Sequence, residues 1–445
     1  MSPELLATTL ALSSAFAPAA LFATLGVASL AGRPLPEGVT GTLVRFTFTL
    51  AVLCNLALIG VMASAGLDRL VIPLGAWFSV GHYSFHVGLL IDRLSAPFAL
   101  LTVVLCGVVG SFAHRYLHRE PGYNRFFVLH ALFATGMTLT VLGASIETIF
   151  FGWELVGLAS ALLIAFYHER PEPVRNGLRT LAIYRLTDIG LLGAAVLLHH
   201  LVGTGQLLHV LGDAPWPHGA TAIDAGPATA AALLLMIAAI GKSAQLPLCG
   251  WLPRAMEGPT PSSAIFYGAL SVHAGAYLLL RAAPLLDRSP AAAAAVTVIG
   301  ALTALHATFV GRVQSDVKSA LAYASLTQVG VIIAEVGLGF RWLPVAHAVG
   351  HACVRTLQLL RAPSALHDFT TTANAVGGVV PRTGGHLERL VPPSWQRHLY
   401  RWSLERGHLD PWLDRWVVAP VLRALRVLDR AERRWTDRLG GGRRG

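Results

Sequence analysis

Residues 241–263 read GKSAQLPLCGWLPRAMEGPTPSS, and they follow an apolar run that extends from Thr229 to Ile240. Pro247 and Pro253 interrupt this stretch, and a Gly-Pro-Thr-Pro turn that ends at Pro261 opens the next apolar run. Proline lacks a backbone N–H and clashes with the preceding turn, so we predict that a helix breaks or ends here. At membrane depth, the freed carbonyl groups are tolerated only where protein or water satisfies them. Lys242, placed beside this break, is therefore predicted to be a charge-transfer site.

Lysine is rare in this chain, because only Lys242 and Lys318 occur among its 34 lysines and arginines. Arginine stays protonated in proteins, whereas a desolvated lysine can lose its proton far more easily than in water. Both lysines lie in otherwise apolar, helix-like surroundings. We interpret them as titratable cations of a functional pathway, and snorkelling or helix-terminal lysines are the alternative.

The composition is that of a membrane protein. Hydrophobic residues make up 54% of the chain, charged residues make up 13%, and the mean hydropathy is +0.58. Soluble domains carry about 25% charged residues, and the apolar runs continue far beyond a signal peptide. The four cysteines are widely spaced without a CxxC pair, so we predict no zinc site, disulfide framework or cofactor in this chain. The net charge of +10 lies in short loops and a C-terminal tail, which indicates membrane topology rather than nucleic-acid binding.

We predict an all-α polytopic membrane protein with about eleven transmembrane helices, each near the ~20 apolar residues that a bilayer requires. The expected spans are residues 3–31, 43–66, 92–113, 126–142, 146–167, 180–202, 229–252, 260–283, 291–311, 318–338 and 344–361. Between the second and third spans, the mixed Trp, Tyr, Val and Gly content of residues 70–90 predicts a short extracytoplasmic hairpin. The segment 369–380 is too short and too polar to span, and re-entry into the membrane is the alternative.

Loop charge predicts the orientation in a bacterial inner membrane. Arginines gather on alternating connections, around Arg33 to Arg45, 114–125 and 170–179, whereas the loop 203–227 contains neither Lys nor Arg. The positive-inside rule places the basic connections in the cytoplasm. With an odd number of spans, the N-terminus is then outside and the C-terminus is cytoplasmic.

The chain changes character near its C-terminal end, and we predict two domains. Residues 1–362 form a transmembrane domain, and residues 363–445 form a basic, amphipathic cytoplasmic segment. Within that segment, residues 392–439 alternate Trp, Leu and Val with Arg and Asp at helical spacing, which is typical of helices that lie on a membrane surface or against a partner. A solvated tail is the alternative, and the glycine-rich end 440–445 is expected to be disordered.

Glu154 is predicted to belong to a proton relay, because it lies far from either end of its apolar span. A buried carboxylate is costly unless it is paired or protonated. Lys242 is its expected partner, since such a pair lowers both desolvation costs and couples the two protonation states. A static ion pair between two helices is the alternative. Arg185 and Asp188, one turn apart, are expected to pair locally, as a structural or a supporting element.

Three histidines and the second lysine extend this candidate pathway. His347 and His351 share one helix face, and His273 lies in the middle of another span. Histidine titrates near neutral pH and suits proton transfer, although a packed polar contact or a metal pair remains an alternative. No third ligand with suitable spacing follows, so no metal site is predicted. Lys318 follows Asp316 at a helix start, where Asp316 is expected to cap the helix and Lys318 to face inward.

Four motifs within residues 85–360 resemble the large antiporter-like subunits of respiratory complex I, such as NuoL, and of Mrp-type cation/proton antiporters. They are FGWELVG (151–157), GKSAQLPL (241–248), GPTP (258–261) and DVKSALAY (316–323). The resemblance implies inverted helical repeats with broken helices. It also implies that Glu154 and Lys242 are the paired proton-site residues and that Lys318, His347 and His351 continue the relay.

The sequence departs from that family pattern at three places. Tyr267 stands where the family's eighth helix has a histidine, and Arg355 stands where its eleventh helix has a lysine after two histidines. No broken twelfth helix follows Arg361, so we expect a truncated second repeat.

These departures resemble the DabB branch of the family, in the stretches YGALSVHAGAY (267–277) and GHACVRTLQLLRAP (350–363). The resemblance implies a non-catalytic, cation-conducting subunit that energises a DabA-like partner, a carbonic-anhydrase-related zinc protein that hydrates CO2 to bicarbonate. Zinc would belong to that partner. Two alternatives remain: an Mrp or complex I-like antiporter module, and a non-conducting membrane anchor for a soluble enzyme.

Overall fold

The computed structural model describes residues 2–80, 83–362 and 391–439. The expectations for residues 369–380 and 440–445 lie outside this part of the chain, as does the boundary region of the two predicted domains. The predicted all-α polytopic fold is confirmed, with the hairpin as its β element.

Within the described residues, ten helices are long and apolar enough to cross a membrane. They are α1 (Pro3–Leu30), α2 (Glu37–Ser64), α3 (Ser95–Tyr116), α4 (Tyr123–Leu142), α5 (Ile146–Ile164), α6 (Pro171–Val202), α8 (Ala225–Lys242), the composite span Thr260–Arg281, α13 (Pro290–Gly311) and α14 (Val317–Gly337). The eleventh predicted span is helix α15 (Trp342–Arg361), which is long enough but too polar to join this set. Its polar residues include His347 and His351, which are predicted to belong to the pathway, and Arg355.

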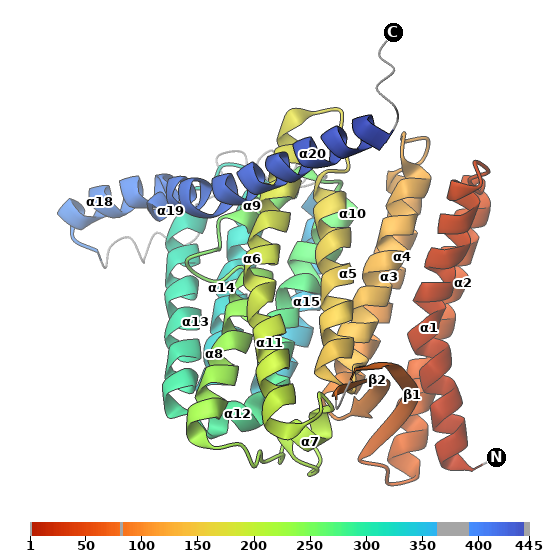
Figure 1. The fold of residues 1–445 in the computed structure, drawn as a ribbon. Helices are drawn as coiled ribbons and strands as arrows, with labels where there is room; N and C mark the ends of the chain where they lie inside the picture. The colour runs from red at the N-terminus through yellow and green to blue at the C-terminus, as the bar shows by residue number, and fades with distance from the viewer. Residues whose placement is uncertain (1, 81–82, 363–390, 440–445) are drawn as a thin grey trace, which may run out of the picture.

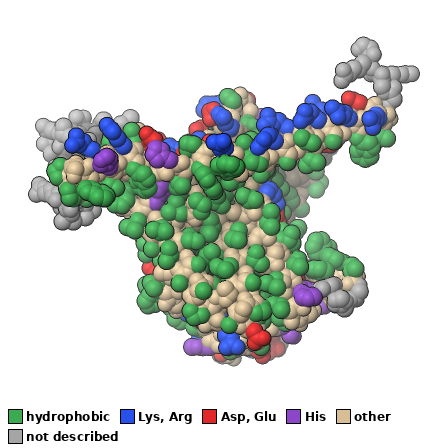
Figure 2. All heavy atoms as spheres, turned by 60° about the vertical axis from the view of Figure 1, so that its left-hand side comes forward, with side chains coloured by type: hydrophobic (Ala, Val, Ile, Leu, Met, Phe, Trp, Pro, Cys, Tyr) green, Lys and Arg blue, Asp and Glu red, His purple; other side chains and the backbone are tan. Residues whose placement is uncertain are grey.

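The long helices stand side by side in one bundle (Figure 1). Helices α1 and α2 form one edge and α13 forms the other, while the short helices α7 (Leu207–Leu211) and α12 (Ala283–Asp287) lie at the lower end. The flank seen in Figure 2 is covered largely by hydrophobic side chains, with arginines gathered at its upper end. This distribution is the one expected for a bundle surrounded by lipid.

The predicted hairpin is present as the antiparallel strands β1 (Arg69–Val80) and β2 (Tyr83–Asp92). It lies at the same end of the bundle as the N-terminus (Figure 1). Asp92 ends the second strand and accepts hydrogen bonds from the backbone N–H groups of Leu94 (3.0 Å) and Ser95 (2.8 Å), and from Arg281 (3.0 Å). Burial by itself raises the pKa of Asp92, but Arg281 and the backbone donors hold that pKa below its usual value.

The predicted helix break lies directly after Lys242, where α8 ends. A non-helical segment that contains Pro247 follows, and then α9 (Trp251–Arg254) and the 3-10 turn η1 (Ala255–Glu257). Pro253 was predicted to interrupt a helix, and it does not. It lies in the first turn of α9, where backbone N–H groups have no intrahelical partner in any case. Pro261 lies likewise in the first turn of α10 (Thr260–Ser262).

The composite span that follows the break contains an irregularity that the sequence did not predict. After α10 the chain forms a π-helical segment, η2 (Ser263–Ala269), before α11 (Ser271–Arg281). Every residue of this span is buried, so it forms the centre of the bundle. π-helical segments inside helices occur frequently at functional sites.

The predicted amphipathic tail forms helices at the end of the bundle opposite the hairpin (Figure 1). They are α18 (Pro393–Leu404), the 3-10 turn η4 (Arg406–His408), α19 (Leu409–Leu413), the π-helical η5 (Asp414–Val418) and α20 (Ala419–Leu439). No residue of α20 is buried, and its arginines face away from the bundle in Figure 2.

Candidate functional site

Lys242 lies in the middle of the bundle at the last residue of α8, and it is completely buried. Its Nζ donates a hydrogen bond to the carbonyl oxygen of Trp153 (3.1 Å). The same atom lies 4.2 Å from the ring centre of Tyr184 and 4.9 Å from that of Trp153. Aromatic faces attract a cation, so α5 and α6 supply a binding place for a charge that lipid would exclude.

Gly241 allows this close approach of α8 to α6. A Cβ atom at this position would overlap the side chain of Thr187. The glycine before Lys242 is thus required by packing, and it places the lysine against Tyr184 and Asp188, which lie on either side of Thr187 on α6.

Asp188 is the acidic group nearest to Lys242, with 4.0 Å between Oδ1 and Nζ. It also accepts hydrogen bonds from Trp153 Nε1 (2.6 Å) and from Arg185 Nη2 (3.1 Å). The predicted local pair of Arg185 and Asp188 is therefore present. Arg185 uses its other nitrogen, Nη1, to bind Glu154.

The structure corrects the expected direct pair of Glu154 and Lys242. Glu154 forms its ion pair with Arg185, while Lys242 is closest to Asp188, so the chain of charges is Glu154, Arg185, Asp188, Lys242. Arginine can bind two carboxylates through separate nitrogens, which is why it bridges the two acids. We name these four side chains the lysine cluster.

Solvent exposure divides the lysine cluster into a partly exposed half and a buried half. The side chain of Arg185 is 42% exposed and that of Glu154 is 21% exposed, whereas Asp188 and Lys242 are buried. The cluster therefore connects the outer surface of α5 and α6 with the interior. This arrangement allows an ion or proton to approach from the surface while the lysine stays shielded.

The predicted histidine line is present in part. His273 Nε2 and His351 Nδ1 lie 3.0 Å apart, although they come from different helices. His347 does not join them: its two nitrogens contact Glu335 and Gln328 on α14, each at 2.9 Å. One ring nitrogen of the His273–His351 contact must donate and the other accept.

Glu335 is a site residue that sequence reasoning missed. It lies inside α14, an apolar helix, and its carboxylate binds His347. The signal was present in the sequence, because an acidic residue inside a predicted span is the same feature that identified Glu154.

Lys318 faces inward from the start of α14, as predicted. Asp316 caps the helix by accepting a hydrogen bond from the N–H of Ser319 (2.7 Å). The Nζ of Lys318 donates to the carbonyl oxygens of Met256 (3.3 Å) and Gly258 (3.2 Å), which belong to the interrupted segment after α9. The second lysine therefore stabilises the freed carbonyl groups of the break.

The two residues that depart from the resembled family are both buried. Tyr267 lies in the π-helical η2 and donates a hydrogen bond to the carbonyl oxygen of Ser160 (3.1 Å). Arg355 lies one turn after His351 and donates to Gln358 Oε1 (2.8 Å). Tyr267 therefore joins η2 to α5, and Arg355 adds a positive charge close to the histidine pair.

Several buried polar atoms lie between the lysine cluster and the histidine pair. Ser243, directly after Lys242, donates a hydrogen bond to the carbonyl oxygen of Val272, directly before His273 (2.6 Å). Within the described residues, four nearby side-chain atoms have no hydrogen-bond partner: Tyr184 Oη, Gln245 Oε1, Ser271 Oγ and His351 Nε2. Polar groups of this kind bind internal water, so a hydrogen-bonded route between the two clusters is chemically feasible.

A second charge network, centred on the largely buried Asp410, joins the C-terminal helices to the broken segment. Asp410 accepts hydrogen bonds from Arg254 (2.8 Å), Arg179 (3.2 Å) and Arg406 (3.2 Å), and Asp414 binds Arg179 as well. Arg254 belongs to α9, so the network attaches the amphipathic helices to the segment that follows Lys242. The sequence contained no pattern that identified these partners, because they are up to 235 residues apart.

In the part of the chain that the structure describes, no group of three or more His, Cys, Asp or Glu side chains is arranged to hold a metal ion. What the described residues assemble is a set of titratable groups connected by hydrogen bonds. The chemistry available to such a set is proton transfer or cation passage.

Comparison with known proteins identifies relatives across most of the chain. The profile of the family described as NADH:quinone oxidoreductase/Mrp antiporter, TM, matches residues 144–378. A second profile, NADH-Ubiquinone oxidoreductase (complex I), chain 5 N-terminus, matches residues 77–127. Both matches agree with the family resemblance found in the four sequence motifs.

Curated relatives carry the names of respiratory subunits. NADH-quinone oxidoreductase subunit L of Neisseria meningitidis serogroup B is 35% identical over 329 residues, which is 72% of this chain and 48% of the relative. NADH-ubiquinone oxidoreductase chain 5 of Dictyostelium discoideum is 34% identical over 327 residues, or 73% of this chain and 48% of the relative. The chain thus spans about half the length of the curated relatives that it matches.

Two solved structures share the fold. The Mrp complex from Dietzia sp. DQ12-45-1b contains a chain that superimposes with a TM-score of 0.63 at 28% identity, covering 81% of this chain and 37% of that chain. An archaeal membrane-bound sulfane sulfur reductase contains a chain with a TM-score of 0.62 at 20% identity, covering 81% and 70%. The second match concerns the fold alone.

Proposed function

This chain belongs to the NADH:quinone oxidoreductase/Mrp antiporter family of membrane subunits, and from that premise we propose that it conducts protons across the membrane. Sodium is the second candidate cation. The observation that carries the proposal is the completely buried Lys242 at a helix break. It is held by Trp153 and Tyr184 and is joined through Asp188 and Arg185 to Glu154, which is partly exposed.

The lysine cluster can couple the protonation of its members. A proton that arrives at Glu154 weakens the hold of that carboxylate on Arg185, which can then interact more strongly with Asp188. Asp188 is the acid that stabilises the charged form of Lys242, so this shift favours release of the lysine proton. Arginine carries the electrostatic signal without titrating, and the lysine carries the proton.

The proposed route then leads through the interior to the second half of the molecule. Tyr184 and Ser271 offer hydrogen-bonding atoms between Lys242 and His273. The His273–His351 contact can pass a proton from one imidazole to the other, and Glu335 with His347 offers a further exchange pair. Lys318 has a different task in this proposal, since it stabilises the broken segment.

The finer proposal concerns the use of this conduction. We propose that proton flow energises a cytoplasmic, DabA-like, carbonic-anhydrase-related subunit that hydrates CO2 and accumulates bicarbonate, with zinc in that partner. Support comes from the stretches 267–277 and 350–363, which resemble the DabB branch. The Arg- and Trp-containing helices α18 to α20 offer a docking surface, and the Asp410 network provides a mechanical connection from that surface to the broken helix.

The orientation is part of the same proposal. Loop charge places α18 to α20 and the C-terminus in the cytoplasm of a bacterial inner membrane, and the hairpin and the N-terminus outside. The opposite positions of these elements in the bundle are compatible with that topology (Figure 1).

A respiratory or Mrp-type cation/proton module is the second candidate. The names of the curated relatives favour it, and so does the Mrp complex among the similar structures. In that case the same lysine cluster would exchange cations within a different assembly, without CO2 chemistry.

Growth at ambient CO2 in a carbonic-anhydrase-deficient host tests the proposal. The chain is co-expressed with its candidate DabA-like partner, as wild type, Lys242→Ala and Glu154→Gln, and the level of assembled complex in the membrane is matched by immunoblot. Rescue by the wild type alone is the expected result. Rescue by all three chains would reduce this protein to an anchor, and no rescue with an assembled complex would favour the respiratory or Mrp-type module.

A further inference from the structure

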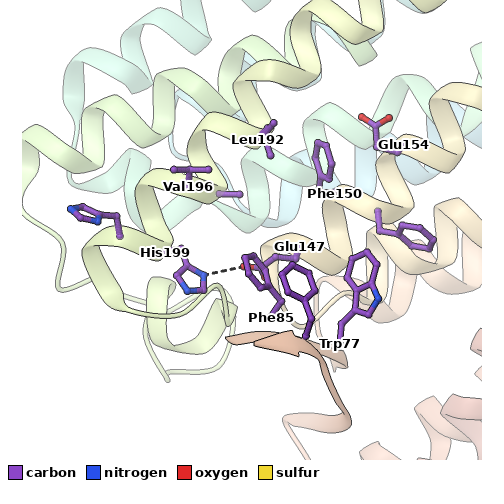
Figure 3. A pocket seen from close by; sticks show the side chains of 12 residues that line it. Trp77, Phe85, Glu147, Phe150, Glu154, Leu192, Val196 and His199 are labelled. Carbon is purple, nitrogen blue, oxygen red and sulfur yellow. Dashed lines mark hydrogen bonds and ion pairs between the residues drawn. The ribbon is translucent and has the colours of Figure 1, made fainter. Parts of the chain in front are cut away.

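A cavity of about 490 Å³ opens between the hairpin, α5 and α6 (Figure 3). Aromatic side chains of the hairpin form one wall, among them Trp77 and Phe85, and Phe150 of α5 lies opposite them (Figure 3). Four titratable side chains also line it: Glu147, Glu154, His199 and His200. The mechanism described above uses only Glu154, which leaves three titratable groups without an assigned task.

Glu147 and His199 face each other at the hairpin end of this cavity. Glu147 Oε1 lies 3.3 Å from His199 Nδ1, and the side chains are 15% and 5% exposed (Figure 3). Glu147 Oε2 is buried without a hydrogen-bond partner among the described residues. A buried carboxylate beside an imidazole is costly unless the two groups share a proton or one of them exchanges it.

The helical register connects this pair with the lysine cluster. Glu147 and Glu154 are seven residues apart on α5, which places them on one face about 10 Å apart along the helix axis. Val196 and His199 line the same space from α6. The cavity therefore extends from the hairpin end of the bundle to Glu154, the member of the lysine cluster that lines it.

We propose that this cavity is a hydrated access route for protons from the hairpin side, and that Glu147 and His199 form its outer proton-exchange pair. Ionisable groups within a membrane protein face water-filled cavities or one another. A proton bound at Glu147 passes through water in the cavity to Glu154, and Phe150 between the two acids narrows the route. This inference rests on the proposed proton conduction. It adds the side of the membrane from which protons enter and the groups that bind them first.

Cysteine accessibility tests whether the cavity contains water. Val196→Cys lines the cavity and Ile189→Cys does not, although both positions are on α6 and are exposed to 64% and 62%. Both are made in a Cys353→Ser background, because Cys353 is the exposed cysteine and the other three are buried. The probe is a membrane-impermeant cationic methanethiosulfonate reagent, applied separately to right-side-out and inside-out vesicles. Ser79→Cys, in the exposed part of β1, reports which preparation presents the hairpin.

We expect Val196→Cys to react at least ~10-fold faster than Ile189→Cys, and only in the preparation that labels Ser79→Cys. This difference follows because thiolate reactivity requires water, which lipid excludes. Equal, slow labelling of both positions would mean that the cavity is filled by lipid, and it would overturn the proposal. Labelling of Val196→Cys from the opposite side would overturn it as well.

Proton flux in vesicles that contain the assembled complex tests the exchange pair. Glu147→Gln and His199→Gln are expected to lower flux driven by an imposed potential at least ~10-fold, since each removes one titrating partner. The matched control is Glu172→Gln, an exposed residue in the first turn of the same helix, α6, which should leave flux unchanged. Glu147→Asp keeps a carboxylate and should restore part of the flux.

The flux of Lys242→Ala separates the proposed access route from the proposed proton conduction. If Lys242→Ala abolishes flux while Glu147→Gln and His199→Gln leave it unchanged, the access route is wrong and the proposed function stands. If Lys242→Ala also leaves flux unchanged, proton conduction through the lysine cluster is wrong, and the access route fails with it.

Discussion

The lysine cluster and the histidine pair occupy the same bundle but stabilise protons in different ways. The lysine cluster combines two carboxylates with one arginine and one lysine, and each carboxylate is paired with an opposite charge. Around His273 and His351, the neighbouring charge is Arg355, which has the same sign as a protonated imidazole. The lysine cluster can therefore hold a positive charge, whereas the histidine pair can bind a proton only transiently.

Mutations in the two regions are therefore expected to have different effects. Removing a member of the lysine cluster leaves a buried partner uncompensated and removes the storage site. Replacing one histidine removes a step in a chain of neutral groups. The contrast makes three predictions, from the largest expected effect to the smallest.

Lys242→Arg is expected to lower proton flux at least ~100-fold, because arginine keeps the positive charge but does not release its proton. Flux in vesicles with matched amounts of assembled complex measures this effect. Lys318→Arg is the matched control, since that lysine binds carbonyl groups that arginine can also bind. Equal flux in wild type and Lys242→Arg would show that charge alone is sufficient and that the lysine does not titrate.

His273→Gln and His351→Gln are each expected to lower flux about tenfold, and the double variant should lose no more than either single variant. Two groups that act as one unit lose their function when either is removed. A double-mutant cycle on flux measures the coupling. Multiplicative losses would show that the two histidines act independently, in conflict with their 3.0 Å contact.

Asp92→Asn is expected to affect stability rather than flux. The change removes the charge from a buried pair with Arg281, at a cost of about 3 kcal/mol by analogy with other buried pairs. Thermal unfolding of the purified protein in detergent should show a lower Tm, while flux per folded molecule stays constant. A selective loss of flux at unchanged Tm would place Asp92 and the hairpin end of α11 in the pathway.

Sequence reasoning located most of the pathway residues but not their pairing. Glu154, Lys242 and His273 were identifiable because an ionisable residue in an apolar span is costly and is therefore kept for a reason. Their partners came from other helices: Asp188 for Lys242, Arg185 for Glu154 and His351 for His273. Sequence spacing describes neighbours on one helix and contains no information about contacts between helices.

At the helix break, too, the sequence predicted one part of the structure and the packing of the bundle decided the rest. Proline chemistry predicted that a helix breaks or ends within residues 241–263, and α8 ends at Lys242, earlier than the expected span 229–252. The position of Pro253 in the first turn of α9 and the π-helical geometry of η2 depend on the packing of neighbouring helices. Local propensity is a weak influence where every residue of a segment is buried.

The sequence by itself determined that this protein is a polytopic helical membrane protein of the antiporter type, with titratable residues at a helix break, a hairpin between its second and third spans and an amphipathic C-terminal region. These features follow from hydrophobicity, proline chemistry and the cost of charge in lipid, all of which are properties of short stretches of chain. Only the tertiary structure decided that Arg185 separates Glu154 from Lys242, that Asp410 gathers three arginines, and that Glu147 meets His199 in a cavity. The physical reason is that ion pairing and cavity shape depend on the distances between helices, which the packing of the whole bundle sets.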